Sequence, residues 1–422
     1  RWAMWNRRRF LATAAVLGAG GVAITLRPSD KGANHSAYFR ELGVALDEAG
    51  LARPTLVIDR QRLLANADVL SGHLAGKHDY RVVAKSLPSL PLLETVMKRT
   101  ETNRLMVFHQ PFLNLVANAL PGSDVLLGKP MPVAAAARFY DELAPGGFDS
   151  GRRLQWLIDS GERLSQYRAL AQQRSLPMRI NLEIDVGLHR GGLRSVAELT
   201  NVLRAIESEP LLTFSGFMGY EPHVVKIPGV IGGPPKAFEK AQSTYRDFVN
   251  AAQEVLGRSI ADLTLNAAGS PTYQLYDGLE PANELSAGSG LVKPTDFDLD
   301  TLADHRPAAF IATPVIKALD TTEVPGLEAL AGLMAWWNPN RARSFFIYGG
   351  YWKAVPASPA GLSIHPIYGH STNQEMLNGS RSVNLQADDW VFLRPTQSEH
   401  VFLQFGDIAV YDEGEIVERW PV

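Results

Sequence analysis

The 422-residue chain contains no cysteine. This absence excludes disulfide bonds, iron–sulfur clusters, thiolate zinc sites and catalysis by a cysteine nucleophile. The chain has 41 Lys and Arg residues and 44 Asp and Glu residues, a net charge of −3, so neither positive nor negative charge is in marked excess. That balance argues against a nucleic-acid-binding protein, which typically carries a basic excess. The apolar fraction of 45% is ordinary for a globular protein, so disordered and collagen-like classes are excluded.

Long apolar runs are also scarce. One stretch, residues 11–26, is rich in Ala and Gly, and roughly 15 apolar residues are short for a hydrocarbon core about 30 Å thick. It follows Arg7, Arg8 and Arg9, and a basic segment before a short apolar one is typical of a signal peptide. The arginine pair resembles a twin-arginine export signal. We therefore expect residues 1–35 to direct export to the periplasm, with a membrane tether through the uncleaved signal as the alternative and no further span.

Short apolar runs alternate with helical patterns in the next part of the chain. A strand at 55–59 and a helix at 60–74 are followed by eight candidate strands, at 81–85, 105–109, 125–128, 154–159, 178–185, 214–220, 263–268 and 285–290. Helical patterns between them include 90–99, 133–143, 162–173, 196–207 and 236–256. Continuously apolar strands that alternate with helices are typical of parallel strands buried on both faces. The pattern predicts a (β/α)8 TIM-type barrel over residues 36–295, with an open doubly wound sheet as the alternative.

The pattern changes near residue 295, where helical signals become rare. Alternating or aromatic runs follow, separated by glycine-containing turns, at 309–315, 344–348, 390–393, 401–405, 408–411 and 416–420. These runs predict a mostly antiparallel C-terminal β domain over residues 296–422.

Active sites of such barrels lie at the C-terminal ends of the strands. Lys85 ends the first predicted barrel strand, and a lysine near buried surface that becomes neutral can form a Schiff base. Residues 269–272 and 287–289, after the seventh and on the eighth strand, are rich in Gly and Ser and can present backbone N–H groups to an anion. Because barrels often bind phosphate after these two strands, the combination points to a phosphorylated ligand held beside an amine.

With these residues the sequence resembles the fold-type III pyridoxal phosphate enzymes, which have an alanine-racemase-like barrel followed by a β domain. Within this group it is most similar to the D-threonine aldolase and D-serine dehydratase family. The similarity covers residues 50–295 well and the β domain loosely. It is carried by residues 54–59 (PTLVID), 81–86 (RVVAKS), 182–187 (LEIDVG) with Arg190 and Gly192, 218–220 (MGY), 269–273 (GSPTY) and 284–289 (ELSAGS).

The resemblance implies a role for individual residues. Lys85 would carry pyridoxal 5'-phosphate as a Schiff base, and Asp185 and Arg190 would be catalytic residues that flank the cofactor. Cofactor-binding roles fall on Lys85, Tyr220, Gly269, Ser270, Thr272, Ala287 and Gly288, of which the last five would form the phosphate cradle. Glu183 is expected to pair inside the barrel with Arg179 or Arg81.

One motif departs from the family. Relatives carry Pro-x-His-x-Cys or Pro-x-His-x-Asp in the β domain and bind a divalent metal there, whereas residues 395–400 of this chain read PTQSEH. Gln397 thus replaces the histidine and Glu399 the second ligand, and Gln is a poor ligand for zinc. His400 follows directly, but adjacent residues of a strand point to opposite faces. The sequence therefore leaves a divalent metal near these residues undecided.

We expect a pyridoxal-phosphate-dependent lyase that acts on a small amino acid, of D configuration, by aldol cleavage or dehydration at Cβ. An amino-acid racemase on the same scaffold is the first alternative, and a non-catalytic protein that binds pyridoxal phosphate is the second. The expected partners are the amino-acid substrate and, because relatives often pair head to tail, a second copy in a homodimer.

Overall fold

A computed structural model describes residues 27–422 of the chain. Of the predicted export signal, residues 1–26 lie outside the described part. The described residues form two compact units. The β unit comprises residues 27–55, Phe310–Arg394 and Gly414–Ile416, and the barrel unit comprises Leu56–Ala309, Pro395–Glu413 and Val417–Val422. The domain boundaries expected at residues 35 and 295 stay predictions.

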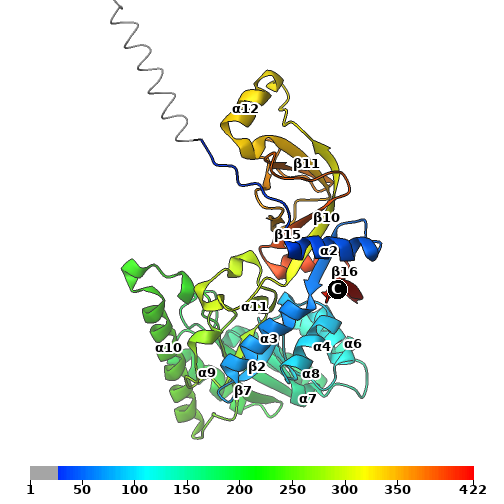
Figure 1. Cartoon of the computed structure of the whole chain (residues 1–422). Helices are drawn as coiled ribbons and strands as arrows, with labels where there is room; N and C mark the ends of the chain where they lie inside the picture. Colours follow the sequence, from blue (N-terminus) through cyan, green and yellow to red (C-terminus); the bar gives the residue numbers. More distant parts are fainter. Residues whose placement is uncertain (1–26) are drawn as a thin grey trace, which may run out of the picture. The chain divides into compact units, whose positions relative to one another are not determined.

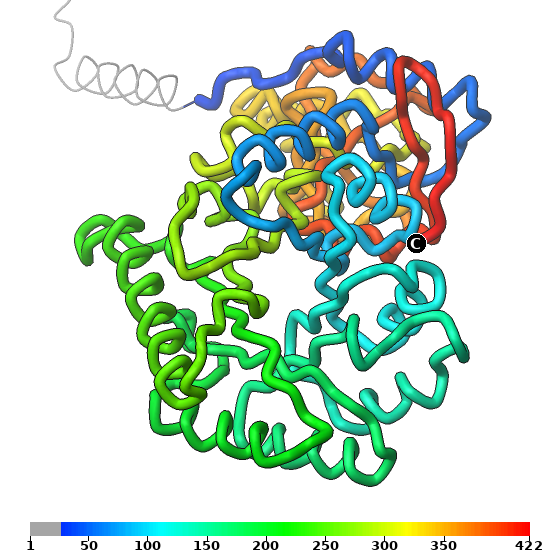
Figure 2. Tube along the Cα trace, turned by 90° about the horizontal axis from the view of Figure 1, so that it is seen from below, coloured from blue at the N-terminus to red at the C-terminus, as the bar shows by residue number. Residues whose placement is uncertain are grey.

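Eight parallel strands close the barrel in the order in which they occur in the chain. They are β2 (Asp79–Val83), β3 (Arg104–Val107), β4 (Asp124–Leu127), β5 (Leu154–Ile158), β6 (Met178–Ile184), β7 (Leu212–Gly219), β8 (Thr264–Ala267) and β9 (Glu284–Ala287). Figure 2 shows the chain from cyan to green following a ring. The last strand pairs with the first, with Tyr80 opposite Leu285, so the predicted TIM-type barrel is confirmed and the open sheet is excluded.

Helices connect the barrel strands, and several of them begin at a capping side chain (Figure 1). They are α3 (Arg60–Leu74), α4 (Leu90–Arg99), α5 (Gln110–Ala119), α6 (Val133–Glu142), α7 (Ser150–Arg153), α8 (Gly161–Arg174), α9 (Val196–Glu207), α10 (Gly233–Leu256) and α11 (Ser289–Val292). At α3 the side chain of Asp59 accepts a hydrogen bond from the Arg62 N–H, and at α9 Ser195 and Glu198 form a capping box. The predicted bounds of α3, α4 and α9 are confirmed.

Charged side chains fill part of the barrel interior. Arg81 of β2 is completely buried, and its Nε donates to Glu284 Oε1 of β9 at 2.5 Å while its Nη2 donates to Asp124 Oδ1 at 2.7 Å. Burial alone would raise the pKa of Glu284, but Arg81 and Arg104 hold it below its ordinary value. Because Arg179 also pairs with Asp124, the expectation that Glu183 pairs with Arg81 or Arg179 is wrong.

The barrel unit also takes in two strands from the end of the chain. β1 (Thr55–Asp59) is buried throughout and pairs in parallel with β16 (Asp407–Asp412), with Leu56 opposite Ile408, and β17 (Glu415–Pro421) follows. The strand predicted at 401–405 is wrong, because this segment is α13 (Ser398–Val401) followed by the 3-10 helix η9 (Phe402–Gln404). Its apolar residues suit a strand, but the buried positions, 398, 401 and 402, have helical spacing.

The β unit is built on antiparallel pairing, as predicted. Its strands are β10 (Ala309–Leu319), β11 (Arg343–Tyr348), β12 (Ala354–Ser358), β13 (Ser363–Ile364), β14 (Gln374–Gly379) and β15 (Trp390–Pro395), and its helices are α2 (Ala37–Glu48) and α12 (Ala331–Trp337). β10 pairs antiparallel with β11 and with β15, and β14 pairs antiparallel with β11 and β13. Within residues 27–422, no helix has the length and apolar character needed to cross a bilayer.

Candidate active site

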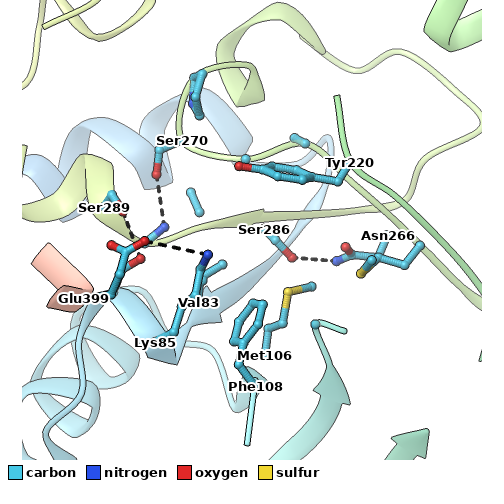
Figure 3. A pocket seen from close by; sticks show the side chains of 18 of the residues that line it. Val83, Lys85, Met106, Phe108, Tyr220, Asn266, Ser270, Ser286, Ser289 and Glu399 are labelled. Atoms are coloured by element: carbon cyan, nitrogen blue, oxygen red, sulfur yellow. Dashed lines mark hydrogen bonds and ion pairs between the residues drawn. The ribbon is translucent and has the colours of Figure 1, made fainter. Parts of the chain in front are cut away.

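A pocket opens where the barrel strands end (Figure 3). It encloses about 640 Å³ of space not filled by protein atoms. Its lining comes from the C-terminal ends of the strands and the turns after them, and from α13: Val83, Lys85, Ser86, Met106, Phe108, Gly128, Arg190, Met218, Gly219, Tyr220, Asn266, Ala268, Gly269, Ser270, Pro271, Ser286, Ala287, Gly288, Ser289, Phe297 and Glu399. The barrel therefore brings residues from distant parts of the sequence to the edge where such folds hold their active sites.

Lys85 lies in a single 3-10 turn, η1 (Ala84–Ser86), that directly follows β2. Its Nζ lies 3.8 Å from Glu399 Oε1 and 4.9 Å from the ring centroid of Phe108. The Lys85 and Glu399 side chains point toward one another, and 42% of the lysine side chain is exposed. The amine is thus reachable from the pocket, and a carboxylate stands next to it.

The predicted phosphate cradle is a pair of turns that Ser270 links together. Ser270 Oγ accepts hydrogen bonds from the N–H groups of Gly288, at 3.2 Å, and Gly290, at 2.9 Å. The first turn is closed by the N–H of Thr272, which donates to the Gly269 carbonyl at 3.0 Å. Thr272 does not line the pocket, since its hydroxyl accepts from the Gly269 N–H and lies behind the turn. Thr272 therefore shapes the cradle from outside.

The two glycines of the cradle have no room for a side chain. A Cβ atom at Gly288 would lie 2.7 Å from the Val83 carbonyl oxygen, and one at Gly269 would lie 2.5 Å from Cε2 of Tyr220. Backbone therefore approaches the pocket closely on both sides, as a phosphate held by N–H groups requires. The hydroxyl groups of Ser86 and Ser289, 2.9 Å apart, add further donors. An amine beside such a donor set fits pyridoxal phosphate.

A buried carboxyl group supports the first turn. Glu221 lies two residues after the end of β7, is 1% exposed, and accepts a hydrogen bond from the Thr272 hydroxyl at 2.5 Å. Burial raises the pKa of Glu221 to about 7, although the Thr272 hydrogen bond acts in the opposite direction. The sequence analysis assigned no role to Glu221. A carboxylate just past the end of an apolar strand, beside Tyr220, is the signal that would have identified it.

Arg190 and Tyr220 lie together, with the Arg190 guanidinium 5.3 Å from the centroid of the Tyr220 ring. Burial raises the pKa of Tyr220 to about 12, so its hydroxyl stays protonated at neutral pH. Both residues line the pocket, as predicted for a site that holds the cofactor ring. Their roles in binding or catalysis stay predictions.

Asp185 does not line the pocket. Its Oδ1 accepts hydrogen bonds from the N–H groups of Gly187, at 3.0 Å, and His189, at 2.9 Å, and its Oδ2 contacts His189 Nδ1. Burial alone would raise the pKa of Asp185, but the hydrogen bonds from His189 and Gly187 hold it below its ordinary value. Asp185 therefore fixes the loop that carries Arg190, which makes it a positioning residue in this geometry.

The sequence analysis did not assign several pocket residues. Asn266 donates to Ser286 Oγ and to Glu284 Oε1, both at 2.7 Å, and so links the pocket to the buried charges of the barrel. Met106 and Phe108 provide an apolar side of the lining (Figure 3). Alternation along the predicted strands would have pointed them inward, but nothing in the sequence distinguished them from core residues.

The segment proposed to correspond to the family metal motif has a different local structure. Glu399 and His400 lie in α13 rather than on a strand, so the argument from opposite strand faces does not apply. The Glu399 carboxylate is the one 3.8 Å from Lys85. Over residues 27–422 no group of three or more His, Cys, Asp or Glu side chains is arranged to hold a metal ion. The donor set here does not fit the family's metal site.

Comparisons with known proteins agree with this architecture. Residues 58–296, more than half of the chain, match the family described as alanine racemase, N-terminal domain. A sequence comparison with curated proteins finds no match. Among solved structures, D-threonine aldolase from Filomicrobium marinum is similar with a TM-score of 0.69 and 15% identity, covering 88% of this chain and 95% of that one.

Two further structures are similar in the same way. D-threo-3-hydroxyaspartate dehydratase from Delftia sp. HT23 has a TM-score of 0.67 at 14% identity, with 88% of this chain and 97% of that chain covered. Alanine racemase from Bacillus anthracis, with bound L-Ala-P, has a TM-score of 0.64 at 13% identity, with 88% and 98% covered. Such low identities establish a shared fold and leave the reaction undefined.

The barrel is closed, a lysine follows its first strand, and a cradle lies at its last two strands. Together these features are typical of a cofactor-binding barrel. The chain belongs to the alanine racemase N-terminal domain family, the fold-type III group of pyridoxal phosphate enzymes.

Proposed function

We propose that this protein is a pyridoxal-phosphate-dependent lyase that acts on a small amino acid of D configuration, by aldol cleavage or dehydration at Cβ. The observation that carries the proposal is the Lys85–Glu399 pair, 3.8 Å apart at the pocket of a fold-type III barrel. The fold is shared with an aldolase, a dehydratase and a racemase, so it is compatible with the lyase and with its alternative.

In this proposal the chain holds the cofactor at two places. Lys85 Nζ would bind it covalently. The turns at residues 269–272 and 287–289 would bind its phosphate through serine hydroxyls and through backbone N–H groups other than those of Gly269, Gly288 and Gly290, which donate to Thr272 and Ser270. When bound, pyridoxal phosphate draws electrons away from a bond at the substrate Cα. Tyr220 would offer an O–H group, since its pKa of about 12 keeps the hydroxyl protonated.

The geometry of the titratable groups favours a lyase. Racemisation by two bases needs proton-exchanging groups on opposite faces of Cα, whereas Lys85 Nζ and Glu399 Oε1 lie together. In dehydration, Lys85 would accept the Cα proton and the Glu399 carboxyl would donate a proton to the Cβ hydroxyl, which leaves as water. In aldol cleavage, the Glu399 carboxylate would instead accept the proton of the Cβ hydroxyl as the Cα–Cβ bond breaks and the aldehyde leaves, and Lys85 would return a proton to Cα. No step is routed through a metal, because the residues near Gln397 do not fit one. The racemase stays the alternative, tested below.

The cofactor assignment is tested first. Purified full chain is incubated with pyridoxal phosphate, reduced with borohydride and mapped by mass spectrometry. We expect the adduct on Lys85, and we expect Lys85→Ala to lose it. Lys98→Ala, which removes an exposed lysine of α4, is the matched control and should keep the adduct on Lys85. An adduct on another lysine in the unaltered protein contradicts the assignment.

The reaction is tested with a panel of D- and L-amino acids, followed for both product release and inversion at Cα. The lyase predicts aldehyde from D-threonine or a keto acid from D-serine, with Glu399→Gln slowing release while the Lys85 adduct still forms. Inversion or Cα proton exchange without release would support the racemase instead. Adding chelators and then divalent metals to the same assays tests metal dependence, and we expect neither to change the rate.

We also propose that the N-terminal segment directs export through a twin-arginine route. The support is the sequence alone, with Arg7 and Arg8 before the apolar residues 11–26. Replacing both arginines by lysine should retain the full chain in the cytoplasmic fraction. Arg9→Lys, at the neighbouring position, serves as control and should leave export unchanged. Equal distribution of all three proteins contradicts the proposal.

A further inference from the structure

One segment of the β unit leaves nearly all of its apolar side chains uncovered. It consists of residues 325–337 and contains η7 (Glu328–Leu330) and α12 (Ala331–Trp337), neither of which has a buried residue. Leu333 is 60% exposed and Trp336 51% exposed. Glu328 is the one charged residue between 325 and 337. We call this segment the apolar flap.

The apolar surface continues beyond the flap. Leu333 and Trp337 share a hollow of about 930 Å³ with Ile367, which is 64% exposed. Figure 1 shows α12 beyond β11, at the edge of the β unit rather than on its sheet. Contiguous exposed patches of this kind mark binding surfaces, because single scattered apolar residues are the norm elsewhere.

The composition of the flap suits a lipid interface. Residues 329–337 read ALAGLMAWW, a run without a polar side chain. Such a run is too short to cross a hydrocarbon core about 30 Å thick. Tryptophan is enriched where a bilayer meets water, and short apolar helices lie along that boundary. A second copy of the chain would use the same apolar residues, so the tests below separate lipid from a dimer.

The chain outside the structure joins the β unit beside this flap. The guanidinium of Arg27 lies 5.5 Å from the ring centroid of Trp336. Ser29 and Lys31 are held three residues past the end of the flap by Asn340. The Lys31 N–H donates to Asn340 Oδ1 and Asn340 Nδ2 donates to the Ser29 carbonyl, both at 2.8 Å. Residues 11–26, the apolar stretch, therefore connect to the fold next to Trp336.

We infer that the apolar flap is a membrane-binding surface, and that its occupant is the boundary of a lipid bilayer. Leu333, Trp336 and Trp337 would enter that boundary, with the exposed cations Arg27 and Arg341 at the level of the headgroups. The inference is independent of the proposed reaction, because the flap contributes no residue to the barrel pocket.

The test uses the full chain and vesicles of phosphatidylethanolamine and phosphatidylglycerol, with and without brominated lipid acyl chains. Bromine quenches tryptophan fluorescence only at contact. All proteins in this test, including the one called unaltered, carry Trp2→Phe and Trp5→Phe, because these two residues precede residues 11–26 and would otherwise report on that segment instead of the flap. We expect quenching in the unaltered chain and loss of most of it in the double variant Trp336→Phe, Trp337→Phe. Leu333→Asp should weaken quenching or vesicle binding by about tenfold, as removal of an inserted leucine requires.

A matched control comes from the barrel unit. Ile231 is 64% exposed in the 3-10 helix η3 (Gly229–Ile231), so Ile231→Asp makes the same kind of change outside the flap and should leave quenching unaltered. Quenching that persists in the double tryptophan variant overturns the inference. Failure of aqueous acrylamide to quench the flap tryptophans in vesicle-free protein would also overturn the inference, because it would indicate that residues 11–26 cover the flap. A dimer that Leu333→Asp dissociates would overturn it too, in favour of a second copy.

Discussion

The buried carboxyl of Glu221 should make the stability of this protein depend on pH in a defined direction. Glu221 is 1% exposed behind the phosphate-binding turn, where it accepts a hydrogen bond from the Thr272 hydroxyl. Burial raises its pKa from 4.5 to about 7. The perturbation we choose is Glu221→Gln, because glutamine keeps the oxygen that accepts from Thr272 and cannot ionise.

The sign follows from the two protonation states. Below about pH 4.5 the group is protonated in both the folded and the unfolded chain, so its contribution to stability is fully present. As pH rises toward 7, the unfolded chain releases the proton while the folded chain retains it, and stability is lost. The interval between 4.5 and about 7 corresponds to roughly 3 kcal/mol of unfolding free energy, at 1.36 kcal/mol per pH unit.

Urea unfolding of the cofactor-free protein measures this effect. Near pH 5 we expect Glu221→Gln to be no more stable than the unaltered chain, and near pH 8.5 to be more stable by up to about 3 kcal/mol. Glu254→Gln, at an exposed position of α10, is the control and should follow the unaltered chain at both values. Parallel pH curves for Glu221→Gln and the unaltered chain would refute the reasoning, because they would mean that Glu221 does not titrate between the two states.

Three further substitutions test other parts of the barrel unit. Gly288→Ala should weaken pyridoxal phosphate binding about tenfold or more, measured by absorbance titration, because its Cβ would lie 2.7 Å from the Val83 carbonyl oxygen. Arg81→Met should lower the unfolding free energy by about 1–3 kcal/mol in urea, since Glu284 would stay buried with Arg104 as its remaining ion-pair partner. Asp185→Asn should cost about 1–3 kcal/mol in the same assay yet still allow borohydride trapping on Lys85; loss of trapping would contradict a purely positioning role.

Much of the fold is visible in the sequence because most barrel strands are short, largely apolar runs between helical patterns. β5 and β9, for example, are buried at every position, and their runs give a clear signal. β12 and β14 gave none, because β12 (AVPAS) is only partly buried and contains a proline, and β14 (QEMLNG) is largely buried but has no β-branched residue. Residues 401–405 misled for the opposite reason, since an apolar run suits a short helix as well as a strand.

The residues of the candidate site were likewise predictable only in part. Lys85, Gly269 and Gly288 were predictable because they sit at or next to strand ends, where the barrel topology itself gathers residues. The contact between Lys85 and Glu399 depends on a helix far along the chain, and sequence spacing carries no information about it. The same holds for Thr272, whose side chain faces Glu221 rather than the pocket because of how one turn folds back.

The way the chain alternates between the two units bears on the order in which the protein can mature during synthesis. The eight barrel strands are complete once the ribosome has passed β9, but Glu399, the one carboxylate among the described residues lining the pocket, belongs to the segment Pro395–Glu413. β16 of the same segment pairs with β1, which is among the earliest barrel-unit residues to be made. A nascent chain that has produced only the barrel strands would therefore expose the Lys85 amine without its carboxylate and leave β1 unpaired with β16. Contacts of such long sequence separation form late, so the finished pocket is a property of the fully translated chain.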